Sequence, residues 1–127
     1  MTQATPCQVT KLHYHRQSRQ LDISFSDGFS ASLSAEFLRV FSPSAEVQGH
    51  GRPVLVTNKK SVAITGLIPV GHYAVKLVFD DGHNSGLYSW PYLLQLCTTQ
   101  NDKWQGYLAQ LKRANANRDE VIAVRQR

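Results

Sequence analysis

The side chains in this chain best suited to chemistry are five histidines and two cysteines. His13 and His15 are two residues apart in an alternating segment, so a strand would place both imidazoles on one face, near one metal ion. No third ligand accompanies them, and a solvent-facing pair is the simpler interpretation. His83 follows an Asp-Gly pair, where it could bind a ligand or partner, or could fix the turn through backbone carbonyls. Both roles of His83 stay open at this stage.

The other reactive side chains form no catalytic set. Gly49-His50-Gly51 lacks the third glycine of a dinucleotide-binding fingerprint, and no P-loop, zinc-protease or nucleophile-elbow motif is present. Cys97 falls on the apolar face of a predicted helix, as buried structural cysteines do. Asp80 and Asp81 are adjacent in a predicted turn, so their carboxylates should point apart. We therefore expect that the protein is not an enzyme.

The composition is that of one globular domain with excess positive charge. Hydrophobic residues make up 42% and charged residues 18% of the 127 residues, which is enough for one core. The net charge of +5 lies largely towards the two ends and favours weak attraction to nucleic acid. No recognition motif accompanies these basic ends, so nucleic-acid binding is a weaker alternative. The polar N-terminus and the lack of ~18 successive apolar residues predict a cytoplasmic protein with no membrane segment.

Alternating apolar and polar residues around two Asp-Gly pairs predict two β-hairpins. The first hairpin turns at Asp27-Gly28, and a weaker alternation over residues 8–16 predicts a strand before it. The second turns at Asp81-Gly82 and follows residues 73–79, which are apolar on both faces and therefore predict a central strand. Further short strands are predicted at residues 54–56 and 62–64.

Capping residues and apolar stripes predict three short helices. Ser34 and Ser89 should cap the first two, with Pro91 in the first turn of the second, and Asn101 should cap the third. The predicted buried stripes are Phe37, Leu38 and Phe41, then Trp90, Leu93, Leu94 and Cys97, then Trp104, Tyr107, Leu108 and Leu111.

These elements predict an α+β fold, in which about three short helices pack on a twisted, mostly antiparallel or mixed β-sheet built from two Asp-Gly hairpins. Residues 8–113 should form the single domain, with flexible tails at 1–7 and 114–127. One echo stands out: Phe25-Ser26-Asp27-Gly28 is matched 54 residues later by Phe79-Asp80-Asp81-Gly82. Chance explains this echo as well as duplication does.

Several segments together resemble a known family. The matching segments are Leu38-Arg39 before Ser42-Pro43-Ser44, residues 69–74, residues 79–86, Tyr88-Ser89-Trp90, and Trp104 with Tyr107-Leu108. This pattern is similar to the gamma-butyrobetaine hydroxylase-like N-terminal domain, also known as domain of unknown function 971, over about residues 8–112. The stretch from Phe79 to Trp90 is its most specific part.

The resemblance raises the question of a zinc site. In the hydroxylase, this domain precedes a separate oxygenase domain and holds zinc with three cysteines and one histidine. The resemblance equates the histidine with His83 and the cysteines with Ser42, Ser44 and Val47. Because hydroxyl groups bind zinc poorly, we expect no zinc and no other cofactor here, but a vestigial site in which His83 faces the Ser42-Pro43-Ser44 turn. A metal-binding accessory role, in which His83 joins other ligands, is the alternative.

The function that we favour at this stage is a non-catalytic binding or adaptor module. Arginine and aromatic side chains are typical interface anchors. The predicted partner-binding surface comprises Arg39, Asp81, His83, Ser85, Tyr88 and Trp90, although Tyr88 and Trp90 could instead belong to the core. Related domains occur fused to P-loop ATPases that carry iron–sulfur clusters. The resemblance therefore implies such a carrier, or a related factor, as a protein partner in iron–sulfur protein assembly. We expect a monomer.

Overall fold

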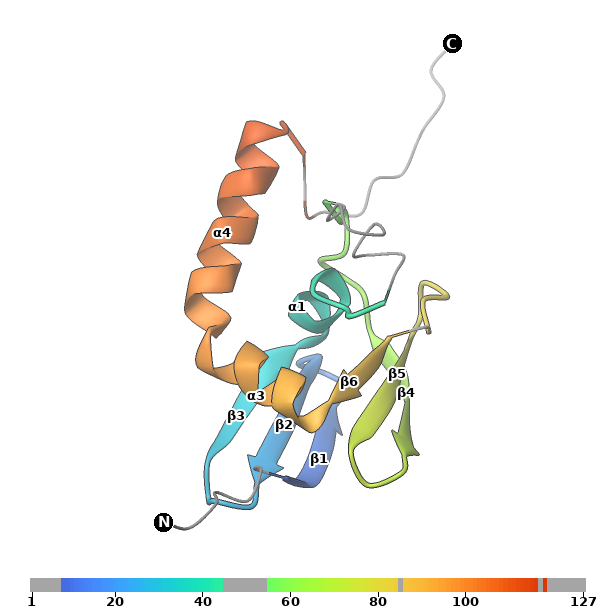
Figure 1. Ribbon diagram of the computed structural model, residues 1–127. Helices are drawn as coiled ribbons and strands as arrows, with labels where there is room; N and C mark the ends of the chain where they lie inside the picture. The colour runs from blue at the N-terminus through green and yellow to red at the C-terminus, as the bar shows by residue number, and fades with distance from the viewer. Residues whose placement is uncertain (1–7, 45–54, 85, 117, 119–127) are drawn as a thin grey trace.

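Two three-stranded antiparallel sheets, each followed by a helix, form the framework of the computed structural model (Figure 1). The structure describes residues 8–44, 55–84, 86–116 and 118. Sheet A contains β1 (Val9–His15), β2 (Gln20–Phe25) and β3 (Ser30–Ser34), and sheet B contains β4 (Ile64–Val70), β5 (Ala74–Phe79) and β6 (Leu87–Ser89). The helices are α1 (Ala35–Val40) after β3, α3 (Trp90–Thr98) after β6, and α4 (Gln100–Arg113). The predicted α+β class is confirmed, and the strands divide into two sheets.

The two Asp-Gly turns have the same hydrogen bonds, so the sequence echo is also a structural repeat. The N–H of Gly28 donates to the Phe25 carbonyl at 3.0 Å, and the N–H of Gly82 donates to the Phe79 carbonyl at 3.1 Å. In both turns the aspartate side chain accepts the backbone N–H of the residue two positions later. Gly28 and Gly82 have φ angles of 93° and 90°, in the left-handed region that favours glycine.

Each half of the chain then ends its third strand in a serine-capped helix. The Ser34 hydroxyl accepts the N–H of Phe37 at 3.0 Å, and the Ser89 hydroxyl accepts the N–H of Tyr92 at 3.3 Å. Both predicted caps are confirmed, and each satisfies a backbone donor at the start of its helix. The two halves therefore share one plan of three strands and a helix.

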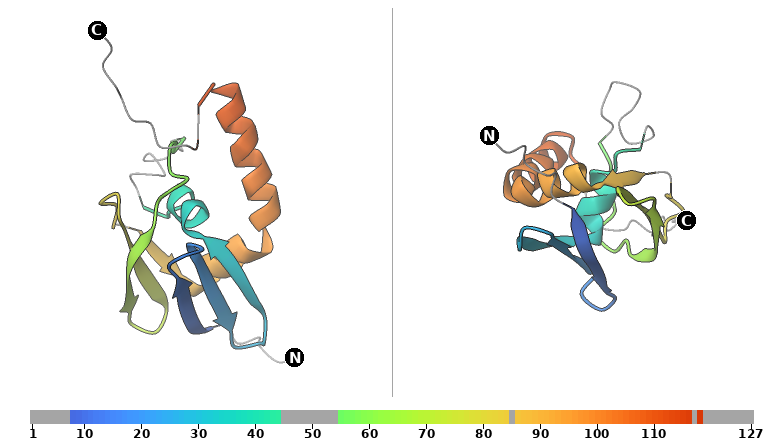
Figure 2. Two further views of the ribbon diagram at one scale, coloured as in Figure 1. Left: turned by 180° about the vertical axis from the view of Figure 1, so that it is seen from behind. Right: turned by 60° about the horizontal axis from the view of Figure 1, so that its bottom comes forward.

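The two halves bury a common core. Figure 2 shows α1 lying above and between the two sheets, while α4 runs up one side of the molecule. The side chains of the core come from both sheets and from helices α1 and α3: Leu21, Ile23, Phe25, Leu33, Phe37, Leu38, Val75, Leu77, Phe79, Tyr88, Leu93 and Leu96 are among them. A smaller cluster of Val40, Tyr107 and Leu111 attaches α4 to the end of α1. The central position of β5 between β4 and β6 is as predicted.

Three details of the predicted elements are wrong. Of the strands predicted at 54–56 and 62–64, residues 55–56 and 62–63 have no regular structure, residue 54 lies outside the described residues, and the register with β5 begins only where Ile64 pairs with Phe79. The last helix starts at Gln100 rather than after Asn101. In α3 the fully buried residues are Leu93 and Leu96, and Cys97 is only half-buried.

The segment after α4 returns to the domain. The Arg118 guanidinium donates from Nε and Nη2 to the two carboxylate oxygens of Glu36, at 2.8 and 2.9 Å. It also lies 5.0 Å from the ring centroid of Trp104. The described part of the predicted C-terminal tail is thus attached to α1, whereas residues 1–7 and 119–127 lie outside the described residues. No helix in the described parts of the chain is long and apolar enough to cross a membrane.

A tyrosine hydroxyl connects the two sheets and yields a first prediction. The backbone N–H of Ile64, at the start of β4, donates to the Tyr14 hydroxyl of β1 at 3.0 Å. Tyr14→Phe leaves this partly buried N–H without its acceptor, so we expect a loss of about 1–2 kcal/mol in the free energy of unfolding, measured by urea denaturation. Tyr73→Phe, at a side chain that is 59% exposed, serves as control and should change stability little. Equal stabilities of the two variants would contradict the bridging role.

Candidate functional site

A buried hydrogen bond joins the end of α1 to the second Asp-Gly turn. Ser42 lies two residues beyond α1 and is fully buried, and His83 is only 6% exposed. The Ser42 Oγ and His83 Nε2 atoms are 2.9 Å apart. The predicted contact between His83 and the Ser42-Pro43-Ser44 turn is therefore present.

The surroundings of this bond are tightly packed. A Cβ atom added to Gly86 would overlap Ser42 Oγ and would lie 3.3 Å from atoms of both Pro43 and Tyr88. The buried Ser44 donates its backbone N–H to Ser42 Oγ at 3.3 Å. Of the three positions equated with zinc-binding cysteines, Ser42 thus contacts His83, Ser44 contacts Ser42, and Val47 lies outside the described residues.

A serine bonded to an imidazole also has the composition of a nucleophile–base pair. Here Ser42 has no exposed surface, so a substrate cannot reach its hydroxyl in this conformation. Cys97, the cysteine within the described residues, is half-buried, and burial raises its thiol pKa to about 11, which keeps it protonated near neutral pH. Neither geometry supports nucleophilic catalysis.

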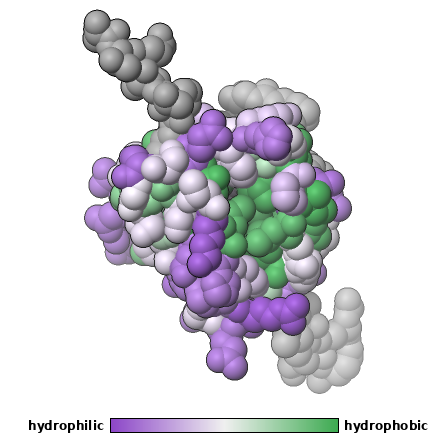
Figure 3. Space-filling model, turned by 90° about the horizontal axis from the view of Figure 1, so that it is seen from below, coloured by the Kyte–Doolittle hydropathy of each residue, from purple (hydrophilic) through white to green (hydrophobic). Residues whose placement is uncertain are grey.

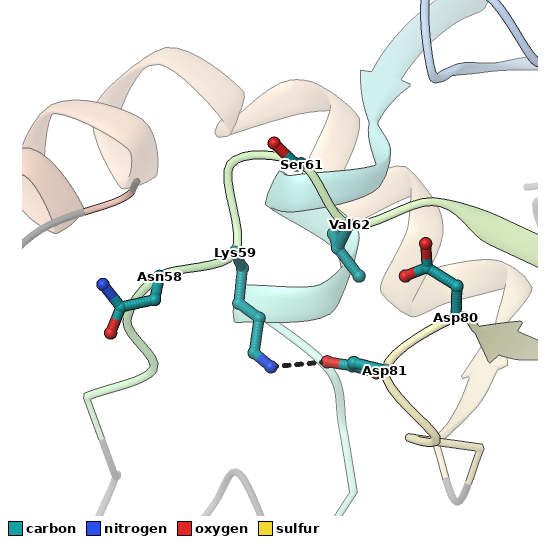
Figure 4. A pocket seen from close by; sticks show the side chains of 6 residues that line it. All are labelled: Asn58, Lys59, Ser61, Val62, Asp80 and Asp81. Atoms are coloured by element: carbon teal, nitrogen blue, oxygen red, sulfur yellow. Dashed lines mark ion pairs between the residues drawn. The ribbon is translucent and has the colours of Figure 1, made fainter. Parts of the chain in front are cut away.

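The Asp81 carboxylate gathers donors from three segments of the chain. Its Oδ2 accepts from Arg39 Nε of α1 at 2.8 Å and lies 2.7 Å from Lys59 Nζ, while its Oδ1 accepts the backbone N–H of His83 at 3.0 Å. Figure 4 shows the Lys59 ammonium directed at this carboxylate. Burial by itself would raise the pKa of Asp81, but the three donors outweigh it and lower the pKa to about 2. Asp81 is therefore ionised and fully engaged within the protein.

The neighbouring carboxylate points elsewhere. The Asp80 and Asp81 side chains diverge on the wall of a shallow pocket of about 230 Å³ (Figure 4). Asp80 accepts the backbone N–H of Ala63 at 3.1 Å, so it holds the chain just before β4. The prediction that the two carboxylates point apart is confirmed, whereas the Asp80 side chain binds the segment before β4 instead of the turn. Among the residues that the structure describes, no group of three or more histidine, cysteine, aspartate or glutamate side chains is placed to hold a metal ion.

The structure separates the residues of the predicted partner-binding surface. Tyr88 is fully buried and its hydroxyl donates to the Leu38 carbonyl at 2.5 Å, so its prediction as a partner contact is wrong and it belongs to the core. Arg39 and Asp81 bind each other, and His83 is buried. Trp90 is half-buried and donates from Nε1 to the His72 carbonyl at 2.7 Å. Ser85 lies outside the described residues. The described side chains of this set therefore mainly make contacts inside the domain instead of forming one exposed surface.

The predicted histidine pair lies on the outer face of sheet A. The rings of His13 and His15 stack with centroids 4.3 Å apart, and His15 Nε2 lies 2.7 Å from Asp22 Oδ2. Asp22 also accepts a hydrogen bond from the Ser32 hydroxyl, and bonds from Ser32 and His15 lower its pKa. This face is polar, and its Asp22 carboxylate interacts with side chains of the same sheet.

The outer face of sheet B differs, and reasoning from sequence did not identify it. Ile68, Lys76 and Leu87 pair across β4, β5 and β6, so their side chains point to one face. Ile68 is 45% and Leu87 48% exposed. Gly66 and Val78 form the next pair on this face. Seen from below, Figure 3 shows apolar residues gathered on the right, where β4 and β5 lie in Figure 1, and hydrophilic residues largely on the left. The sequence signal was the double-sided apolar pattern of residues 73–79, which we attributed to a central strand alone.

The repeat allows equivalent positions on the outer faces of the two sheets to be compared. Lys76 stands five residues before Asp81, as Asp22 stands five residues before Asp27. Asp22 pairs with His13 and Ser32, so the row Ser32–Asp22–His13 of sheet A corresponds to Leu87–Lys76–Ile68 of sheet B. The same structural unit carries polar neighbours in one copy and apolar neighbours in the other.

Comparison with known proteins agrees with this architecture. A family model, "Gamma-butyrobetaine hydroxylase-like, N-terminal", matches residues 12–94. The chain belongs to this family. No curated protein matches it.

Three solved structures resemble this member of the family. One protein solved by NMR is 55% identical, with a TM-score of 0.81 and coverage of 100% of this chain and 98% of its own. A second NMR structure is 47% identical, with a TM-score of 0.79 and coverage of 93% and 94%. A crystal structure of a protein with unknown function from Acidithiobacillus ferrooxidans, of the domain of unknown function 971 family, is 38% identical, with a TM-score of 0.61 and coverage of 70% and 91%.

The low pKa of Asp81 predicts a pH-dependent contribution to stability. Its ion pairs stabilise the fold fully above the ordinary aspartate pKa of 3.8, and this contribution is lost as the pH falls towards about 2. Asp81→Asn should therefore lower the free energy of unfolding by about 1–2 kcal/mol at pH 7, with a smaller loss near pH 2.5, in urea titrations at both pH values. Asp80→Asn serves as control. A loss for Asp81→Asn that does not change between the two pH values would contradict this account.

The packing of Gly86 against Ser42 predicts coupling between the two positions. Ser42→Ala removes the partner of a buried imidazole, and Gly86→Ala forces a methyl group against the hydroxyl, so each should cost about 1–3 kcal/mol. In the double variant the hydroxyl is absent and the methyl group fits better, so the combined loss should be smaller than the sum by at least about 0.5 kcal/mol. Chemical denaturation of the four proteins measures this difference. Gly106→Ala, where an added Cβ meets nothing within 4 Å, is the control and should not destabilise the protein. If the losses of the two single variants at positions 42 and 86 are strictly additive in the double variant, the contact is refuted.

Proposed function

We propose that this protein is a non-catalytic binding module that recognises another protein through the outer face of sheet B, defined by Gly66, Ile68, Lys76, Val78 and Leu87. The observation that carries the proposal is the exposure of Ile68 and Leu87 on one row of this face, at 45% and 48%. Single exposed apolar side chains are common, but two of them that flank one lysine in the same row of a sheet favour an interaction surface. The equivalent row of sheet A shows that the same unit also accommodates polar residues there.

The partner should lie across this face rather than extend the sheet as another strand. β4 is an edge strand of sheet B, and Pro69 within it has no backbone N–H to donate to an added strand. β6, at the other edge, has only three residues. Both edges therefore favour contact through side chains.

The sites inside the domain support a scaffold role in preference to catalysis or metal binding. His83 and Ser42 are buried and bonded to each other, and serine hydroxyls are poor zinc ligands. We propose that this cluster fixes the second turn relative to α1 without zinc or any other cofactor. The second turn then orients β6, the strand that carries Leu87.

The family resemblance suggests where to look for the partner. Related domains occur fused to P-loop ATPases that carry iron–sulfur clusters, so an iron–sulfur carrier ATPase or a related factor is the first partner to test. In this proposal the domain supports iron–sulfur protein assembly through protein contacts. We propose that it acts as a monomer when no partner is bound.

Replacing the exposed apolar pair tests the function. Ile68→Ser combined with Leu87→Ser should reduce recovery of the bound protein at least tenfold in quantitative affinity purification with the full chain, because the apolar contact is lost. The melting temperature should change little, since both side chains are exposed. His13→Ser, at the position in sheet A that corresponds to Ile68, is the matched control. If the double variant and the control recover the same proteins in the same amounts, sheet B is not the binding surface.

A further inference from the structure

Lys76 has the character of a specificity determinant on the outer face of sheet B. We infer that the partner is a different protein that places a carboxylate against the Lys76 ammonium, within an otherwise apolar docking surface. This inference rests on the proposed function and adds the chemistry of the partner to it.

The position of Lys76 is the first support. It lies between Ile68 and Leu87 in one row of the sheet, on the central strand. Its side chain is half-buried, as expected when a lysine lays its aliphatic part along apolar neighbours and keeps its ammonium in water. A protein that covers Ile68 and Leu87 also removes water from this ammonium. Because an unpaired charge is costly to desolvate, the partner must supply an acceptor, and a carboxylate compensates best.

The second support is that Lys76 has no ion pair with any described residue. By contrast, the equivalent residue of sheet A, Asp22, interacts with side chains of its own sheet. Asp22 Oδ2 lies 2.7 Å from His15 Nε2, and its Oδ1 accepts from the Ser32 hydroxyl at 2.5 Å. Sheet A binds the carboxylate of its central row with its own side chains, whereas the Lys76 ammonium of sheet B stands between apolar side chains without an ion pair to a described residue.

Charge also argues against a second copy of this chain as the occupant. A two-fold axis through the centre of this face would bring the Lys76 ammonium groups of both copies together. Like charges at an interface are unfavourable, and each copy has a net charge of +5. The same positive charge would accelerate association with an acidic partner.

The test begins with a photocrosslinker at the surface. p-Benzoyl-phenylalanine at position 87 of the full chain, expressed in cells, should crosslink one protein at a segment that contains an aspartate or glutamate. With that protein purified, we expect Lys76→Glu to weaken binding at least about tenfold and Lys76→Gln to weaken it less, because the first change adds repulsion. Replacing the partner's carboxylate by lysine should restore binding to the Lys76→Glu variant. Lys11→Glu on sheet A changes the net charge equally and should have a much smaller effect.

Each result has a distinct consequence. Loss of binding on Lys76→Glu, with rescue by the reversed charge on the partner, supports the inference. If Ile68→Ser with Leu87→Ser abolishes binding and Lys76→Glu does not alter the affinity, the acidic partner is refuted and the binding module stands. A crosslink to a second copy, with dimers in sedimentation velocity, likewise refutes it. If position 87 crosslinks to no protein, both the inference and the proposed function fail.

Discussion

The Asp81 carboxylate lies where three segments that are distant in sequence meet, and the rest of the fold depends on this meeting point. It is bound by Arg39 of α1 in the first half, by Lys59 of the segment before β4, and by the backbone of its own turn. The buried Ser42–His83 bond lies next to it and joins the same two elements. Together with the Tyr88 hydroxyl, which donates to the Leu38 carbonyl, these contacts give the packing of α1 on the second half a direction that apolar packing by itself lacks.

The internal repeat shows how one local unit can serve two purposes. Both halves use the same turn, with the same aspartate and glycine bonds, and both end in a serine-capped helix. Position 83 distinguishes them: Phe29 in the first turn is 38% exposed, whereas His83 in the second is buried and bonded to Ser42. The second turn is thus anchored to α1 by a polar bond, and this anchoring holds the strand that carries Leu87. A structural site inside the domain therefore supports a surface outside it.

The family resemblance bears on the contact between Ser42 and His83. The resemblance to the hydroxylase domain implies a metal ion between the end of the first helix and the histidine of the second turn, whereas in this chain a hydroxyl and an imidazole join these two elements. A hydrogen bond and close packing at Gly86 hold the two turns together. In the proposed function this contact fixes the second turn relative to α1.

The sequence alone determined the local elements, because their causes are local. The turns required glycine after aspartate, the helices required a serine cap, and the alternating segments required one buried face; each follows from a few neighbouring residues. The contact between His83 and Ser42 was also predictable, because the family pattern places both residues. The tertiary structure alone decided which side chains are exposed. Tyr88 stands beside Trp90 in the chain and resembles an interface anchor, but its burial depends on the position of α1, 50 residues away. The apolar outer face of sheet B likewise exists only once strand pairing has aligned Ile68, Lys76 and Leu87, because a period of two does not reveal which face of a strand the rest of the protein covers.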